Sequence, residues 1–171
     1  MTDRGVAVVT GASSGIGAAT AVRLAAAGFD VVLGARRVDR LSDVASACGP
    51  AARAMALDVT SDESVQAFCA SLSSCRVLVN NAGGAFGLGA VADADLDQWQ
   101  RMYDTNVLGT VRLVRALLPM LEASGDGVVL NVGSVAGIEP YVGGAGHNAA
   151  KFGEQGVILV RGGGCERVAE G

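Results

Sequence analysis

The stretch "GVAVVTGASSGIG" at residues 5–17 decides the fold. Its first part, residues 5–10, is a continuous apolar run, which is typical of a strand covered on both faces. Gly11, Gly15 and Gly17 follow at once and lead into a segment with helical propensity. A glycine-rich turn at that place lets a phosphate approach the helix N-terminus, where free N–H groups and the helix dipole favour negative charge. The stretch therefore predicts a nucleotide-binding turn.

Short apolar strands alternate with helix-like segments along the rest of the chain. Strands are expected at 29–35, 52–58, 76–80 and 127–134, and helices at 17–28, 38–49, 61–72, 95–125 and around Lys151. Such alternation predicts an α/β fold: a doubly wound parallel sheet with helices on both faces. No repeat or linker interrupts the pattern, so residues 1–160 are expected to form one domain.

Composition and charge exclude several classes of protein. With 50 % hydrophobic residues and a net charge of −4, the 171-residue chain offers no electrostatic basis for binding nucleic acid or an anionic membrane. No apolar run reaches the roughly 20 residues of a membrane span, and no leader is recognisable, so a cytoplasmic protein is expected. The four cysteines form no CxxC pattern and there is one histidine, so no metal site is predicted and the thiols are expected to be reduced and buried.

Three motifs together resemble the short-chain dehydrogenase/reductase family. They are "TGASSGIG" at 10–17, "NNAG" at 80–83, and a spaced set in which Ser134 is followed thirteen residues later by position 147, which stands four residues before Lys151. The resemblance covers residues 5–160. It implies a Rossmann-like fold and hydride transfer between a nicotinamide cofactor and a small alcohol or carbonyl substrate.

The residues after the second expected strand bear on the choice of cofactor. NAD-specific members of such folds place an acid there to hold the ribose 2′-OH, but this chain has Ala35, followed by Arg36 and Arg37. A guanidinium pairs well with a 2′-phosphate, so NADP is favoured over NAD and Arg36 is expected to discriminate most. The alternative is a solvated pair of surface arginines.

The resemblance also implies which residues line the cofactor. Asp58 and Val59 would flank the adenine, and Asn81, Ala82 and Gly83 would line the adenosine side of the cleft. The turn that would hold the pyrophosphate consists of Thr10, Gly11, Ser13, Ser14, Gly15, Ile16 and Gly17.

Four positions match the catalytic pattern of the family, one of them with a substitution. By resemblance, Asn106 holds a water against the lysine, Ser134 binds the substrate oxygen, and Lys151 grips the nicotinamide ribose and lowers the pKa of a catalytic tyrosine. In this chain that tyrosine position holds His147. Tyr141 stands six residues upstream, on the expected loop, and is not predicted to replace it.

His147 and Lys151 are spaced i and i+4, so they lie on one helix face about 5–6 Å apart at Cβ. Histidine titrates near pH 6.5, and a neighbouring cation lowers its pKa further. A neutral imidazole accepts a proton during alcohol oxidation but is a scarce acid for carbonyl reduction. Three readings stay open: a weakened catalyst, a cofactor-binding protein without catalysis, and a surface histidine in a non-functional product.

The end of the sequence departs from the family as well. Three consecutive glycines in "RGGGCERVAEG" disfavour helix, and the elements with which related chains continue do not follow. We expect a C-terminally shortened chain with a disordered tail at 161–171 and a fifth strand without a further neighbour in the sheet. If the chain forms an oligomer, two copies are expected to pair through their long helices.

Overall fold

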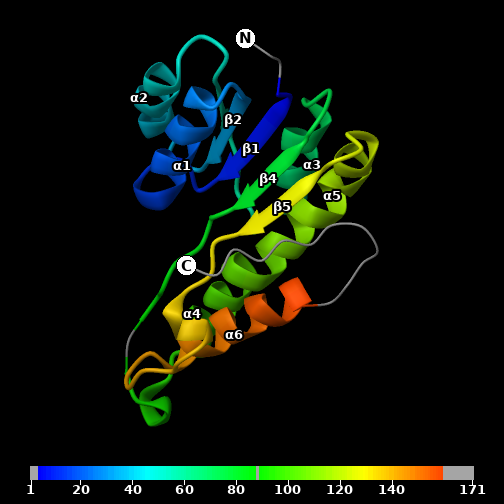
Figure 1. Cartoon of the computed structure of the whole chain (residues 1–171). Coiled ribbons are helices and arrows are strands. Elements are labelled where there is room, and N and C mark those ends of the chain that lie inside the picture. Colours follow the sequence, from blue (N-terminus) through cyan, green and yellow to red (C-terminus); the bar gives the residue numbers. More distant parts are fainter. Residues whose placement is uncertain (1–3, 88, 160–171) are drawn as a thin grey trace.

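The computed structural model describes residues 4–87 and 89–159 as five parallel strands with helices around them (Figure 1). The strands lie in the order β3-β2-β1-β4-β5, and all four pairings are parallel. Their bounds are β1 (Val6–Thr10), β2 (Asp30–Ala35), β3 (Arg53–Ala56), β4 (Val77–Asn80) and β5 (Val128–Asn131). The predicted doubly wound parallel sheet is confirmed.

Helices cover both faces of this sheet. The α-helices are α1 (Gly15–Ala26), α2 (Val38–Cys48), α3 (Asp62–Ala70), α4 (Leu96–Tyr103), α5 (Gly109–Ala123) and α6 (Ala145–Leu159), with short helical turns η1 (Val91–Asp93), η2 (Asp104–Leu108) and η3 (Val135–Gly137). In Figure 1, α1 and α2 lie on one side of the sheet and α3 and α5 on the other.

Alternation along β1 explains the two layers of the core. Val8 faces the α3–α5 side, where it joins Phe68 and Leu113 in one buried cluster. Its neighbour Val9 faces the opposite side and packs with Leu41 under α1 and α2. A strand that buries both faces must be apolar at every position, which is why residues 6–9 form an uninterrupted apolar run.

The long helix expected over 95–125 is divided into two. Asp95 caps α4 by accepting backbone hydrogen bonds from Asp97 and Gln98 at 3.0 and 3.3 Å. The π-helical turn η2 then separates α4 from α5. Such a turn is rare inside a helix and often marks a functional site, and here it carries Asn106, which is fully buried.

At the far edge of the sheet, β5 pairs only with β4 among the described residues. This agrees with the expected bare fifth strand as far as the described chain reaches. The expected disordered tail at 161–171 lies outside the described residues. No helix of the described part is long and apolar enough to cross a membrane.

Candidate active site

The glycine-rich turn after β1 has the close backbone packing that the sequence predicts. Gly11 and Gly15 have φ angles of +63° and +57°, in the left-handed region where a Cβ is strained. Gly17 lies so near the turn that a Cβ there would meet the Gly11 carbonyl oxygen at 2.7 Å. Around Gly15, by contrast, a Cβ would meet nothing within 4 Å. The turn is tight within itself and open at the start of α1.

Thr10 and Asn81 fasten this turn to the end of β4. The Thr10 hydroxyl oxygen accepts hydrogen bonds from the backbone N–H groups of Asn81 and Ala82 at 3.0 and 2.9 Å. The side-chain amide of Asn81 donates to the Thr10 carbonyl at 3.0 Å and to the Gly11 carbonyl at 3.3 Å. Asn81 thus holds the turn in shape from the side of β4.

Of the two arginines after β2, Arg37 is the one that contacts the turn. Its guanidinium donates hydrogen bonds to the hydroxyl oxygens of Ser13 at 3.0 Å and Ser14 at 2.9 Å. The exposed Arg36 instead lies close enough to Asp58 for its charge to act on that carboxyl. Arg37, Ser13 and Ser14 together form a positively charged and hydroxyl-rich corner of the turn, with Arg37 rather than Arg36 at its centre.

Asp58 and Val59, which are predicted to flank the adenine, lie beyond the end of β3. Burial acts to raise the pKa of the Asp58 carboxyl, but hydrogen bonds from Thr60 and the charges of Arg36 and Arg112 outweigh it and lower the pKa. The Asp58 side chain is therefore held as a carboxylate. Val59 is buried, and its methyl group packs against Gly109, where a Cβ would meet it at 2.8 Å.

The segment Gly83–Gly84 after β4 is the point where the catalytic elements meet. A Cβ on Gly83 would lie 2.6 Å from Asn106 Oδ1 and 3.7 Å from Lys151 Nζ. The Asn106 amide donates to the Gly84 carbonyl at 2.9 Å and its oxygen accepts from the Gly84 N–H at 3.2 Å. Asn106 also donates to the Met102 carbonyl at 2.7 Å. Its side chain is thereby used to tie η2 to the loop after β4.

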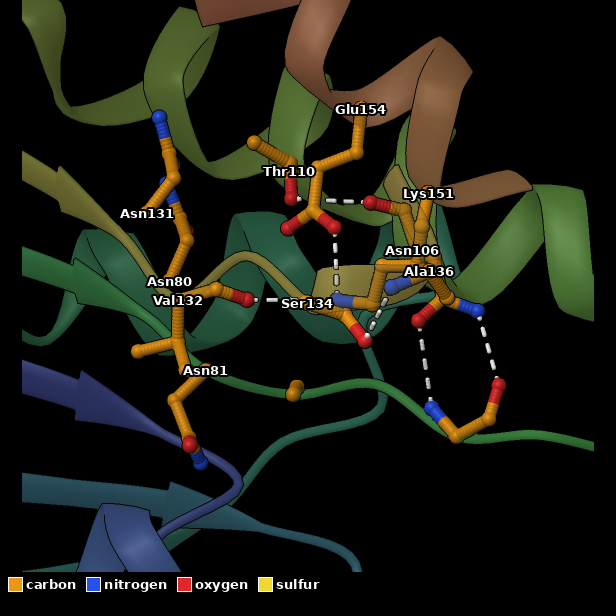
Figure 2. A network of polar contacts seen from close by, with 12 residues as sticks. Asn80, Asn81, Asn106, Thr110, Asn131, Val132, Ser134, Ala136, Lys151 and Glu154 are labelled. Atoms are coloured by element: carbon orange, nitrogen blue, oxygen red, sulfur yellow. Dashed lines mark hydrogen bonds and ion pairs between the residues drawn. The ribbon is translucent and has the colours of Figure 1, made fainter. Parts of the chain in front are cut away.

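Ser134 lies beyond the end of β5 and caps the turn η3. Its half-buried hydroxyl oxygen accepts a hydrogen bond from the Ala136 N–H at 3.2 Å (Figure 2). Within η3, a Cβ on Gly137 would meet the carbonyl oxygen of Lys151 at 2.8 Å, so α6 packs directly on this turn. The hydroxyl and the lysine of the predicted pattern are brought together by that packing.

Lys151 is buried, with 9 % of the residue exposed. Its ammonium donates to the carboxylate of Glu154 at 2.6 Å and to the carbonyl of Val132 at 3.2 Å. Figure 2 shows this ammonium between α6 and the segment that follows β5, which carries Val132 and Ser134. The charge predicted for the site is therefore present and has an acidic partner that the sequence interpretation did not name.

His147 stands in the first turn of α6 and is half-buried. Burial lowers the pKa of its imidazole, and the charge of Lys151 lowers it further, while the backbone of Gly84 acts in the opposite direction. The direction agrees with the i, i+4 prediction, although burial is the larger cause. Its Nδ1 atom is buried and makes no hydrogen bond of ordinary geometry.

Tyr141 does not take the place of the missing phenol. It lies in the loop before α6, where its ring packs over Gly144 so closely that a Cβ there would meet the phenol oxygen at 2.7 Å. Its carbonyl accepts a hydrogen bond from the Asn148 amide at 2.9 Å. His147 therefore remains the candidate for the acid/base position within the described residues.

Sequence reasoning missed Glu154, although a signal was available. A carboxylate three residues after a lysine lies on the same helix face, where the two side chains can pair. The described cysteines are free, and burial raises the pKa of Cys69 to about 11 and of Cys75 to about 12, as expected of inert thiols. Among the residues that the structure describes, no acidic, histidine and cysteine groups gather into a metal site.

Known proteins share both the sequence and the fold. An uncharacterized oxidoreductase of Mycobacterium tuberculosis is 58 % identical over 150 residues, which are 88 % of this chain and 59 % of that protein. A closed form of serine dehydrogenase complexed with NADP+ superposes with a TM-score of 0.85 at 34 % identity, covering 90 % of this chain and 64 % of that one. A metagenomic short-chain oxidoreductase in complex with NADP gives 0.84 at 37 % identity, covering 90 % and 72 %.

The chain thus spans about three fifths of the curated relative named above, 59 % of its length. The family model described as short chain dehydrogenase matches residues 5–161. That range includes the glycine-rich turn, the loop after β4, the end of β5 and the lysine of α6. The chain belongs to the short-chain dehydrogenase family.

Proposed function

We propose that this chain binds NADP(H) and supports hydride transfer between that cofactor and an alcohol or carbonyl substrate. The observation that carries the proposal is the position of the Lys151 ammonium, next to Gly83 and beyond the end of β5. There it stands between the nucleotide turn on one side and Ser134 on the other. In parallel α/β sheets, ligands bind outside the carboxyl ends of the strands, which is where all of these groups lie.

The residues at the turn fit a dinucleotide. The N-terminus of α1 begins at Ser14, whose side chain makes no capping hydrogen bond, and the adjoining Gly15 faces open space. Free N–H groups there suit a pyrophosphate. Arg37 with Ser13 and Ser14 supplies charge-assisted donors for a 2′-phosphate, and no carboxylate stands at Ala35 to repel it. This supports NADP over NAD.

The chemistry of the site follows from its own residues, while the bound cofactor supplies or takes up the hydride. The Ser134 hydroxyl would bind the substrate oxygen, and the Lys151 ammonium has one N–H left for a ribose hydroxyl. His147 is the group that would exchange a proton with the substrate oxygen. Because its pKa lies below the ordinary value of about 6.5, it is mostly neutral at pH 7. It therefore favours alcohol oxidation, and we propose that turnover is impaired.

A second function has its own support. The Nδ1 atom of His147 is buried and makes no hydrogen bond of ordinary geometry, although the backbone of Gly84 acts on the imidazole, and a catalytic base is usually held in one orientation by such a bond. The chain would then bind NADP(H) without turning it over. The arrangement of the nucleotide turn supports this function equally well, since none of its contacts involves His147.

One pair of measurements tests these functions. NADPH and NADH binding is followed by fluorescence titration, and cofactor consumption is followed over a panel of aldehydes, ketones and alcohols. We expect NADPH to bind more tightly than NADH and turnover to be slow but above that of Lys151→Met. Binding with turnover equal to Lys151→Met would favour the binding protein, and no binding of either cofactor would refute both.

We also propose that two copies of the chain pair through their long helices. Large apolar side chains are exposed along this layer: Leu96 and Tyr103 on α4, Leu108 on η2, Val111 and Leu118 on α5, and Phe152 on α6. Sedimentation velocity measures the outcome, a dimer at micromolar concentration. A monomer at all concentrations would contradict the proposal.

A further inference from the structure

Glu154 is an acidic side chain in an interior position. Only 4 % of its side chain is exposed, and it lies on α6 one turn after Lys151, facing the η2 and α5 residues that Figure 2 draws beside it. A carboxylate without water is strongly unfavourable unless a charge or hydrogen bonds compensate it. Its compensation is the Lys151 ammonium, 2.6 Å away.

We infer that Glu154 is a positioning residue of the candidate site, whose carboxylate fixes the Lys151 ammonium and limits the effect of that positive charge on His147. The inference rests on the proposed function, because it gives Glu154 a role only if Lys151 and His147 act together. It concerns a residue that touches neither the proposed substrate nor the proposed cofactor. Its effect passes through Lys151.

The count of donors at the ammonium supports the first half of the inference. A lysine ammonium has three N–H donors and no acceptor. One donates to Glu154 and one to the Val132 carbonyl, so the ammonium is held from α6 and from β5 at once. The third is left for a ligand on the Gly83 side. The chain thus sets the ammonium in place by its own contacts.

The order of charges along α6 supports the second half. His147, Lys151 and Glu154 stand at i, i+4 and i+7, which places them along one helix face with the lysine in the middle. Lys151 is the charged side chain that acts on His147, and it acts to lower the pKa. A carboxylate on the far side of the ammonium offsets part of that field.

Among the described residues, Lys151 is the charge that acts on His147, and the charged groups of the elements packed on α6 are paired elsewhere or exposed. Of the elements packed on α6, η3 contains no titratable side chain. On α4, Arg101 lies over the Phe86 ring at 4.8 Å and Asp97 is exposed, and on η2, Asp104 pairs with Arg112 at 2.7 Å. At the end of α4, the Tyr103 ring packs toward Gly153. Glu154 is therefore the group to vary.

The test uses the single histidine of the sequence as its reporter. Its imidazole resonances are titrated by NMR in the unmodified chain and in Glu154→Gln, which keeps an oxygen acceptor for Lys151 but removes the charge. We expect the pKa of His147 to fall by about 0.5–1 unit, less than the 1–3 units of a charge in direct contact. An unchanged or raised pKa would overturn the inference.

Asp126→Asn is the matched control. It also removes one carboxylate, but this one is exposed, pairs with Arg76, and stands before β5, at the opposite end of the sheet from the site. Salt and water screen such a distant exposed charge, so no shift of the His147 pKa is expected. A shift as large as that of Glu154→Gln would assign the effect to net charge and overturn the inference.

A measurement on the unmodified chain serves if Glu154→Gln does not fold. The carboxyl carbon of Glu154 is titrated, and its hydrogen-bond coupling to Lys151 Nζ is sought by NMR. An ionised carboxylate at pH 7 that is coupled to Nζ supports the inference, and a protonated one overturns it. Neither titration requires cofactor or turnover, so failure here is distinguishable from failure of the proposed function.

Discussion

The nucleotide turn and the catalytic helix differ in how completely their polar groups are paired. In the turn, Thr10 hydrogen-bonds to Asn81 after β4, and Ser13 hydrogen-bonds to Arg37 after β2. In α6, His147 Nδ1 and Asn148 Oδ1 are buried without hydrogen-bond partners, and they are the two such side-chain atoms within residues 4–87 and 89–159. Both lie in the first helical turn, where the sequence also departs from the family pattern.

This difference bears on the function proposed for the start of α6. Buried polar groups in folded proteins are nearly always paired, so a cluster of unpaired ones marks either a functional site or the loss of a partner. The polar groups of the turn have hydrogen-bond partners within the chain. At the start of α6, Lys151 is held by Glu154 and Val132, while His147 Nδ1 and Asn148 Oδ1 make no hydrogen bond of ordinary geometry.

We expect the largest change in turnover from placing a phenol at position 147. In His147→Tyr, the Lys151 charge would lower the pKa of the phenol from about 10 toward neutrality, which makes it an effective acid. A placed general acid is worth about 10²–10⁴-fold, and we expect NADPH-dependent carbonyl reduction to rise by such a factor. Steady-state kinetics measures it, with His147→Tyr/Lys151→Met as the control that loses the gain. Turnover below that of the unmodified chain would show that the histidine is a tuned catalyst.

Breaking the ion pair on α6 should have the next largest effect. Glu154→Leu leaves the ammonium of Lys151 buried without a counter-charge, which costs about 3–5 kcal/mol in the free energy of unfolding. The double variant Lys151→Met/Glu154→Leu replaces both charges and should recover most of that stability. Urea unfolding measures both. Equal losses in the two variants would mean that packing, and not charge, makes Glu154 important.

In the nucleotide turn, Arg37→Ala should weaken NADPH binding without changing the fold. Loss of a charge-assisted contact to the 2′-phosphate costs about 1.5–3 kcal/mol, or roughly 10–150-fold in Kd, while NADH binding should hardly change. Arg36→Ala is the matched control with the smaller effect, because Arg36 does not contact the serines of the turn. Calorimetric titration gives the four affinities. A larger effect from Arg36 would restore the assignment made from sequence alone.

The smallest expected effect is a pH dependence of stability. Because the folded pKa of His147 is lowered, the unfolded chain binds more protons between that pKa and about 6.5, and stability falls as the pH falls through this window. Glu154 acts oppositely: its folded pKa is raised, so its contribution falls as the pH rises from about 4.5. His147→Gln isolates the first effect in melting curves between pH 5 and 7.5. Identical pH profiles for variant and unmodified chain would refute it.

The fold was accessible from sequence because each signal was local. The apolar run of β1, the glycines of the turn, and Gly28 after α1 with its φ of +93° each follow from nearby residues. The π-helical turn around Asn106 was not accessible, because it depends on hydrogen bonds to Gly84 that are 22 residues away in the sequence. Continuous helical propensity over 95–125 concealed it.

The candidate site was accessible only in part, for a similar reason. Spacing placed His147 and Lys151 on one face and predicted the direction of the pKa shift. It could not show that Arg37, and not Arg36, turns toward Ser13 and Ser14, since adjacent side chains point in different directions that only the packing of β2 against β1 decides. Glu154 was overlooked because a charged residue in a helix is usually on the solvated face.

The link between Thr10 and the loop after β4 has a consequence for the order of folding. The partners of the Thr10 hydroxyl are 71 and 72 residues away, and contacts of such separation form late because long loops must close first. The local unit of β1, α1 and β2 therefore contains every glycine of the turn, but the hydrogen bonds that clamp the turn form only when β4 joins the sheet. We therefore expect bound cofactor to slow the unfolding of the complete sheet. The rates of the early steps of its assembly should not change when cofactor is present.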